Sequence, residues 1–251
     1  MKPENAVSLN LSTVEVNHVS MCFNLYQQKV DSLKEYVIKA IKGQLYFEEF
    51  WALQDVSFEI KRGESVALMG KNGCGKSTML KTIAGVLKPT KGSVERLSDI
   101  APMIELGVGF DFDLTARENV YLNGALLGYS QEMLDDNFDK IINFAELERF
   151  VDVPIKNFSS GMLARLGFAI STVKNAEILI VDEILSVGDY KFQEKCEERI
   201  HEMMKNNTTV LFVSHSKDQV KKICNRGILL DSGKVVLDAD IDSVCEKYGQ
   251  E

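Results

Sequence analysis

The sequence predicts an α/β fold in which a mostly parallel sheet is covered by helices. Apolar runs typical of buried strands alternate with amphipathic stretches typical of helices along most of the chain. Residues 113–175 show helical patterns alone, which predicts a helical subdomain inserted into the sheet. We therefore expect one domain over 1–251. Its expected parts are a core of about 14–112 and 176–238, the inserted subdomain and a short C-terminal helix over 240–248.

The elements of the first third follow from periodicity and from turn residues. Val30, Leu33, Val37 and Ile41 recur at steps of three and four, which indicates an amphipathic helix. In chain order, the expected elements are a strand over 14–21, the helix over 30–42, strands over 56–60 and 66–69 joined by a turn at 61–64, and a helix over 77–84, after which Pro89 and Gly92 interrupt the pattern.

Hydroxyl-bearing caps mark two helices of the middle third. Thr115 and Glu118 have the spacing of a capping box, which predicts a helix that runs toward Leu127. Ser130 predicts the start of a second helix that ends near Phe144. The remaining expected elements are a helix over 160–173, a buried strand over 177–181, a helix near 190–205, strands over 209–213, 228–230 and 235–237, and a short helix that ends at 248.

The composition is that of an ordinary globular protein, with 45% hydrophobic and 26% charged residues. It excludes a disordered chain, a collagen-like chain and a small disulfide scaffold. The net charge of −8 argues against nucleic-acid binding through the whole surface. The five cysteines are odd in number and lack C-x-x-C spacing, which indicates a reducing cytosol rather than a disulfide framework or a zinc site. They are Cys22, Cys74, Cys196, Cys224 and Cys245.

No apolar run approaches the ~20 residues that a membrane-spanning helix needs. Residues 1–16 lack a basic region followed by an apolar one, so no signal peptide is predicted. We expect a soluble chain. If it acts at a membrane, another chain supplies the spans.

A glycine-rich motif, G-K-N-G-C-G-K-S over 70–77, carries the strongest chemical signal. It matches G-x-x-x-x-G-K-[ST] and lies between a predicted strand and a predicted helix, a context that disfavours a chance glycine turn. Its glycines let backbone N–H groups converge on phosphate oxygens, and the helix N-terminus adds positive charge. Lys76 is expected to reach the β- and γ-phosphates, and the Ser77 hydroxyl to bind Mg²⁺. The predicted ATP-binding residues here are Gly70, Lys71, Asn72, Gly73, Cys74, Gly75, Lys76, Ser77 and Thr78.

Two carboxylates, Asp182 and Glu183, follow the apolar run over 178–181. In open α/β sheets, ligands bind at the carboxyl ends of the strands. Asp182 suits Mg²⁺ coordination, and Glu183 suits a general base that polarises water for attack on the γ-phosphate. The alternative is an ordinary strand end with solvated acidic side chains. The glycine-rich motif over 70–77 argues against this alternative.

The segment F-S-S-G-M over 158–162 precedes an amphipathic helix and resembles the signature motif of ABC ATPases, usually written LSGGQ. A serine hydroxyl and backbone N–H groups at a helix N-terminus form a second anion site. A plain helix cap with a turn glycine is the alternative. The resemblance implies that Ser159, Ser160, Gly161 and Met162 contact the ATP that is bound by the opposite subunit.

Further motifs occur in the order in which ABC ATPases have them, and they restrict the resemblance to one group within that family. Asp189 has the position of the D-loop aspartate, and His215 that of the switch histidine, which implies contact with the γ-phosphate. The segments ELGVGF over 105–110, LTARENV over 114–120 and DEILSVGDYKFQEKC over 182–196 are similar to those of bacterial polysaccharide exporters. The chain thus resembles, from about residue 14 to Tyr248, the ATP-binding subunits that export O-antigen, capsule or teichoic acid.

This resemblance implies an ABC-type P-loop NTPase fold with an antiparallel β portion. It implies ATP and Mg²⁺ as ligands, and a head-to-tail pair of two copies with an ATP between each phosphate loop and the opposite signature. The implied partners are two copies of a transmembrane permease subunit, with a lipid-linked polysaccharide as cargo and no nucleic acid. The implied location is the cytoplasmic face of the inner (plasma) membrane, peripheral through the permease. The polymer, its lipid carrier and the Gram type of the host stay open.

The chain departs from the family pattern at several positions. The Q-loop position, usually glutamine, is Glu105, whose carboxylate can still bind Mg²⁺ or water. Phe23 is the expected aromatic contact of adenine, with Tyr26 and Trp51 as alternatives. The stretch 24–50 is either core packing or a coupling surface. Because the sequence ends at Glu251, no C-terminal carbohydrate-binding domain is expected.

Three other functions are weighed against polysaccharide export. An ABC importer or drug exporter is disfavoured by the long 24–50 stretch, by Glu105 and by the S-S-G-M signature. A soluble ABC protein that acts on DNA or ribosomes usually has two cassettes or a long coiled-coil insertion. A nucleotide-binding regulator without turnover is disfavoured by the presence of Glu183 and His215.

Overall fold

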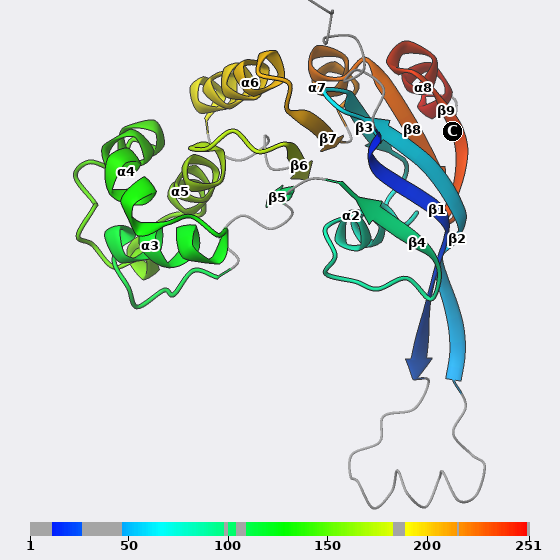
Figure 1. Ribbon diagram of the computed structural model, residues 1–251, viewed down its shortest axis with the longest axis horizontal. Coiled ribbons are helices and arrows are strands. Elements are labelled where there is room, and N and C mark those ends of the chain that lie inside the picture. The colour runs from blue at the N-terminus through cyan, green and yellow to red at the C-terminus, as the bar shows by residue number, and fades with distance from the viewer. Residues whose placement is uncertain are drawn as a thin grey trace, which may run out of the picture.

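The computed structural model describes residues 12–26, 47–97, 100–103, 109–182, 189–214 and 216–249. These residues form two β-sheets and a set of helices (Figure 1). The predicted helix over 30–42 lies outside the described residues.

A six-stranded sheet forms the centre of the molecule, with the strand order β5-β6-β7-β3-β8-β9. The first five strands are parallel, and β9 pairs antiparallel with β8 through a tight hairpin. The strands are β3 (Ser65–Met69), β5 (Ile100–Met103), β6 (Ile178–Asp182), β7 (Thr209–Val213), β8 (Arg226–Asp231) and β9 (Lys234–Asp240).

A second, antiparallel sheet has the order β2-β1-β4 and contains β1 (Ser12–Tyr26), β2 (Phe47–Lys61) and β4 (Lys91–Arg96). The predicted turn after β2 is present, since Glu64 N donates to Lys61 O at 3.1 Å. The strands on its two sides nevertheless belong to different sheets. The sequence patterns did not predict β4, because all its residues except half-buried Val94 are exposed. Nor did they predict β5, which is four residues long and contains Pro102.

Seven α-helices and one 3₁₀ helix occur among the described residues. Both predicted caps of the middle third are confirmed: Thr115 N donates to the Glu118 carboxylate at 2.8 Å, and Met133 N donates to Ser130 Oγ at 3.2 Å. No described helix is long and apolar enough to span a bilayer. The helices are α2 (Lys76–Ile83), α3 (Ala116–Leu126), α4 (Gln131–Ala145), η1 (Ile155–Asn157), α5 (Ser160–Thr172), α6 (Tyr190–Lys205), α7 (Lys217–Ile223) and α8 (Ile241–Tyr248).

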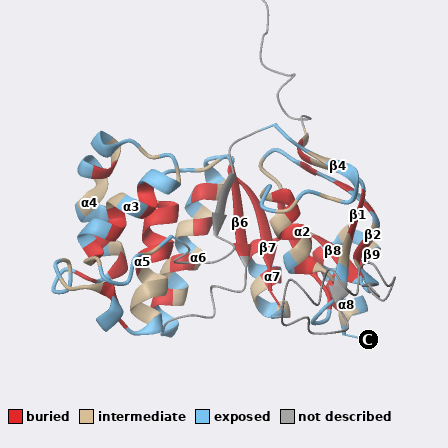
Figure 2. Cartoon of the chain, turned by 90° about the horizontal axis from the view of Figure 1, so that it is seen from below, coloured by how far each residue is buried: buried red, intermediate tan, exposed pale blue. Residues whose placement is uncertain are grey.

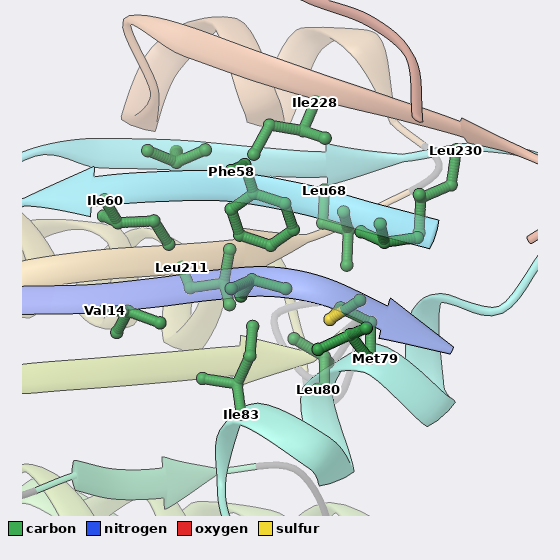
Figure 3. Packing of buried hydrophobic residues seen from close by; sticks show 14 of the residues in the cluster. Val14, Phe58, Ile60, Leu68, Met79, Leu80, Ile83, Leu211, Ile228 and Leu230 are labelled. Atoms are coloured by element: carbon green, nitrogen blue, oxygen red, sulfur yellow. The ribbon is translucent and has the colours of Figure 1, made fainter. Parts of the chain in front are cut away.

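The central strands are buried on both faces, so successive residues enter different cores. Met69 of β3 joins a cluster with residues of α6, α7 and α8, whereas Leu68 joins a cluster between the two sheets. Met79, Leu80 and Ile83 of α2 complete the second cluster (Figure 3). Helix α2 is thus held in place by apolar contacts on the side away from solvent.

Helices α3, α4 and α5 share a third apolar cluster of their own. In Figure 2 the buried faces of these three helices are turned toward one another, and the helices lie beside the strands of the central sheet. No strand lies between α3 and α5, in agreement with the helical pattern of the sequence.

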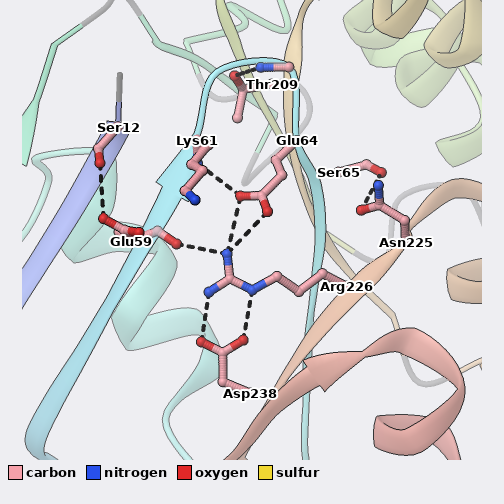
Figure 4. Close-up of polar contacts among 10 residues, drawn as sticks. Ser12, Glu59, Lys61, Glu64, Ser65, Thr209, Asn225, Arg226 and Asp238 are labelled. Carbon is pink, nitrogen blue, oxygen red and sulfur yellow. Dashed lines mark hydrogen bonds and ion pairs between the residues drawn. The ribbon is translucent and has the colours of Figure 1, made fainter. Parts of the chain in front are cut away.

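The two sheets are also joined by a polar network around Arg226, at the amino end of β3 (Figure 4). Its guanidinium donates to both oxygens of Asp238 at 2.7 Å and to Glu64 Oε2 at 3.1 Å. It also donates to the main-chain oxygen of Glu59 in β2 at 3.0 Å. The glycine-rich loop lies at the opposite, carboxyl end of β3.

Candidate functional site

The glycine-rich loop joins β3 to α2 and depends on backbone angles that favour glycine. Gly70, Gly73 and Gly75 have φ angles of +145°, +79° and +108°. A Cβ on Gly70 would lie 2.2 Å from Leu230 O, and one on Gly75 would lie 2.6 Å from Ala52 O. At Gly73 a Cβ would meet no atom within 4 Å, so this glycine borders open space. The loop is therefore packed from behind and open in front.

The N-terminus of α2 lacks the capping that the other described α-helices have. Its N-cap, Gly75, makes no side-chain hydrogen bond. The first N–H groups of an α-helix have no partner within the helix, so those of Ser77 and Thr78 are available to an anion. The side chains that cap the other described α-helices are those of Thr115, Ser130, Ser159, Asp189, Ser216 and Asp240.

Lys76 supplies a buried positive charge to the loop. Its side chain reaches back so that Nζ donates to Gly70 O at 2.7 Å and to Lys71 O at 3.0 Å. The residue is 7% exposed. Both oxygens are uncharged main-chain carbonyls, so these bonds orient the ammonium without neutralising it. A buried cation beside available N–H groups fits the phosphates of a nucleotide.

The turn between β8 and β9 supports the loop from the side. Gly233 N donates to Cys74 O at 3.0 Å, and Gln54 N donates to Gly233 O at 2.8 Å. The Cys74 side chain is buried in the core, and burial raises the pKa of its thiol. Cys74 therefore anchors the loop. The sequence patterns did not identify this support, because Gly233 lies far from the motif along the chain.

Three strands bring their carboxyl ends to the edge where the loop begins. Leu68 of β3 is opposite Val213 of β7, and Val213 is opposite Asp182, the last residue of β6. The loop and the backbone of Asp182 thus share one edge of the sheet, as predicted for a ligand site. Ser77 is exposed in the first turn of α2. The side chain of Asp182 and the residues Glu105, Glu183 and His215 lie outside the described part of the structure.

The polar groups on both sides of position 215 are bonded to each other. Ser214 is buried, and its Oγ donates to Gln219 Oε1 at 2.8 Å and accepts from Ser216 N at 3.0 Å. These bonds join the end of β7 to the start of α7. The sequence patterns did not predict α7, which buries only Val220 and Ile223.

The signature segment caps α5, as its simpler interpretation predicts. Ser159 Oγ accepts from Met162 N at 3.2 Å, which leaves the hydroxyl proton for another acceptor. Ser159 and Ser160 are exposed, and Gly161 leaves room beside the cap. A pocket of about 390 Å³ opens there. It is lined by Ser159, Gly161, Met162, Arg165, Glu146, Leu147, Phe150 and Asp189, and by no residue of the glycine-rich loop.

Asp189 lies in the same pocket and caps α6. Its Oδ1 accepts from Phe192 N at 3.0 Å, and its Oδ2 accepts from the Arg165 guanidinium. The Phe192 N–H and then the Arg165 charge lower the pKa of Asp189. The sequence patterns treated Asp189 and the signature as separate and did not identify Arg165. A signal was present, since Arg165 is the one charged residue of α5.

The structure does not select among the aromatic candidates for adenine. Phe23 is half-buried and packs against the core between the two sheets. Trp51 is half-buried, with Lys91 Nζ 5.2 Å from its ring centre. The side chain of Tyr26 is not among those described. The aromatic contact stays a prediction.

We expect Gly73→Ala to weaken ATP binding by at least about 10-fold, because its methyl group enters the open front of the loop. Gly128→Ala is the matched control. Gly128 has a φ of +78° and likewise no atom within 4 Å of its Cβ position, but it lies after α3. Both variants are expected to lose about 1 kcal/mol of stability from left-handed backbone strain. Calorimetric titration with ATP, together with chemical denaturation, checks this. Equal ATP affinity in the two variants contradicts a phosphate contact at Gly73.

Comparisons with known proteins add sequence similarity to these structural observations. The family model described as ABC transporter matches residues 53–186. The O-antigen export system ATP-binding protein RfbB of Klebsiella pneumoniae is 42% identical over 243 residues, which cover 94% of this chain and 97% of that protein. The teichoic acids export ATP-binding protein TagH of Listeria monocytogenes serotype 4b is 42% identical over 238 residues, which cover 94% of this chain and 70% of that protein.

Solved structures share the same fold. The ATP-binding subunit of an ABC transporter has a TM-score of 0.75 at 24% identity, with 95% of this chain and 94% of that chain covered. A dimeric ATP-binding cassette in a post-hydrolysis state, bound to ADP and Pi, has a TM-score of 0.72 at 25% identity. It covers 91% of this chain and 98% of that chain. The predicted fold class is confirmed.

Proposed function

The chain belongs to the ABC transporter family of ATPases, and from this premise we propose that it powers the export of a lipid-linked cell-surface polysaccharide. The cargo would be O-antigen, capsule or teichoic acid, moved across the cytoplasmic membrane. The observation that carries this proposal is the nearly full-length similarity to ATP-binding proteins of O-antigen and teichoic acid export. The glycine-rich loop supports the ATPase part of it.

In this proposal the loop holds the phosphates of ATP. The N–H groups at the start of α2 and the Lys76 ammonium bind phosphate oxygens, and they are held in place before ATP binds. Ser77, Asp182 and Glu105 are the proposed ligands of Mg²⁺. Bound Mg²⁺ would neutralise charge on the β- and γ-phosphates. The exposed Ser77 hydroxyl and the backbone of Asp182 at the same sheet edge fit that donor set.

Turnover requires a group that orients the attacking water. We assign this role to Glu183, which directly follows Asp182 in the sequence. His215, after the buried end of β7, is proposed to contact the γ-phosphate. Both assignments are predictions from the motif pattern.

A second copy is proposed to complete each nucleotide site. Within one chain, the pocket at the signature includes no residue of the glycine-rich loop. In a head-to-tail pair, the exposed Ser159 and Ser160 of one copy would face the ATP on the loop of the other. The dimeric ADP-bound cassette that shares this fold supports the arrangement. Two permease subunits are the proposed membrane partners, which would place the pair at the cytoplasmic face of the membrane.

Replacement of the chain by its Glu183→Gln form in the source cell tests the proposal. One surface polysaccharide is expected to disappear from the cell surface and to accumulate inside, because the transporter binds ATP without turnover. Glu177→Gln is the control, since it makes the same change at the exposed opposite end of β6. Polysaccharide is quantified in surface and internal fractions. If the surface polysaccharide is unchanged although the variant is stably expressed, the export of polysaccharide is contradicted. The chain would then be an ABC ATPase with another cargo.

A further inference from the structure

Arg165 joins three helix ends beside the signature. From α5, its Nη1 donates to Glu146 Oε2 at 2.7 Å, and Nη2 donates to Asp189. Glu146 is the C-cap of α4, and Asp189 is the N-cap of α6. The guanidinium also lies over the Phe192 ring, 4.8 Å from its centre. One side chain therefore connects the end of α4, the start of α5 and the start of α6.

The first turn of α5 is held in the core only by partly buried side chains, those of Met162 and Leu163. The buried residues of α5 begin at Leu166, and Leu166, Ala169 and Ile170 pack into the cluster with α3 and α4. Ser159 and Ser160 are exposed. Arg165 follows Gly161 by four residues and Met162 by three, so it lies on their face of the helix. Its ion pairs join this face to the end of α4 and the start of α6.

The charges around Arg165 are balanced within the chain. Glu146 also accepts from Lys195 Nζ at 3.4 Å, and Lys195 donates to Phe144 O at 2.8 Å. Two cations thus face two carboxylates, and the two Nη groups of Arg165 are both engaged. The Arg165 side chain is 18% exposed. This arrangement suits a side chain that orders its surroundings rather than one that binds phosphate itself.

We propose that Arg165 is a positioning residue for ATP turnover, which holds the signature cap Ser159 and the aspartate Asp189 in one fixed arrangement that a second copy can engage. The inference rests on the proposed function, since the signature acts there on the ATP of the opposite copy. A fixed distance between the starts of α5 and α6 keeps the exposed Ser159 and Ser160 in one position toward the partner's nucleotide. Loss of the Arg165 ion pairs would leave the glycine-rich loop intact and would disturb only the signature segment.

Arg165→Ala tests this in the full chain. We expect ATP affinity of the single copy to stay within about 2-fold, since no loop residue lines the pocket. We expect kcat to fall by roughly 10- to 100-fold, because misplacement by about 1 Å can cost that much. ATP-driven dimerisation in a Glu183→Gln background is expected to weaken by at least about 10-fold. Arg165→Lys keeps the charge and one ion pair, and it should recover part of both.

Arg199→Ala is the matched control. Arg199 connects α6 to the opposite end of α5, where its Nε donates to Thr172 O at 3.1 Å, and it is 22% exposed. Arg199→Ala therefore removes a comparable connection between α5 and α6, at the end of α5 opposite to the signature segment. We expect dimerisation and kcat close to those of the unsubstituted chain, even where the two variants lose similar thermal stability.

Asp189→Asn removes the ion pair with Arg165 and keeps the N-cap of α6, because asparagine still caps a helix. It should reproduce the dimerisation defect of Arg165→Ala, and the double variant should be no worse than either single one. Equal effects of Arg165→Ala and Arg199→Ala, or full activity of both Arg165→Ala and Asp189→Asn, would overturn the inference alone. Failure of the unsubstituted chain to hydrolyse ATP and of its Glu183→Gln form to dimerise with ATP would overturn the proposed function and the inference with it.

Discussion

Lys76→Ala is expected to abolish ATP hydrolysis and to weaken ATP binding by roughly 100-fold. The side chain places a buried ammonium between two main-chain carbonyls at the glycine-rich loop. A charge-assisted hydrogen bond contributes about 1.5–3 kcal/mol, and each 1.4 kcal/mol is about 10-fold in affinity. The variant loses the bonds to phosphate and the positive charge together. Calorimetric titration with ATP and a phosphate-release assay measure the two effects.

Two controls separate this effect from a general loss of structure. Lys88→Ala removes an exposed lysine after α2 and should leave both ATP affinity and turnover unchanged. Thermal unfolding without nucleotide should show that Lys76→Ala still folds, because the contacts of Met79, Leu80 and Ile83 hold α2. Wild-type hydrolysis by a folded Lys76→Ala protein would be incompatible with phosphate binding at this loop.

Glu183→Gln is expected to slow turnover by at least about 100-fold, the low end for loss of an acid–base group. The substitution keeps the size of the side chain and removes its ability to take a proton from water. ATP affinity should be preserved, because the loop at the end of β3 and the backbone of Asp182 are unchanged. The variant should therefore accumulate as an ATP-bound dimer, which sedimentation with and without ATP detects.

The same substitution at Glu177, directly before β6, is the control for Glu183→Gln. Glu177 is exposed and lies at the amino end of the strand, away from the edge where the loop begins. Its variant should hydrolyse ATP at the wild-type rate. Unimpaired turnover by Glu183→Gln would exclude this residue as the base and direct attention to Glu105 or His215.

These two substitutions divide the proposed cycle into binding and chemistry. Lys76→Ala is expected to lose the ATP-bound dimer, whereas Glu183→Gln is expected to stabilise it. Dimerisation with ATP is expected to decrease in the first variant and to increase in the second. Opposite changes in one measured quantity are more informative than two losses of activity. The Arg165 variants add a third case, in which ATP still binds and the dimer does not form well.

Much of the fold was predictable because its signals are local. The capping box of Thr115 and Glu118 and the cap of Ser130 depend on residues within one helical turn. The strands over 178–182 and 209–213 are nearly continuous apolar runs, as expected where both faces of a sheet are covered. These patterns were sufficient for the fold class and for the helical insertion.

The elements that were missed lack such patterns. The strand β4 is exposed along nearly its whole length, and its pairing with β1 is decided by the hydrogen bonds of its backbone rather than by its side chains. The sequence predicted two strands joined by the turn after β2, without their partners, and β3 pairs parallel with β7 and β8 in the other sheet. Strand partners depend on the whole topology, which a turn does not specify.

By itself, the sequence determined which residues are suited to bind phosphate, because the glycine spacing, Lys76 and the helix start are contiguous and act through the local backbone. It also predicted the helix that follows the signature segment, with a helix cap as one of two interpretations of that segment. Only the tertiary structure decided that Gly233 supports the loop and that Arg165 joins Ser159's helix to Asp189. These contacts link segments distant in the chain, and they form only when strand order and helix packing have brought those segments together.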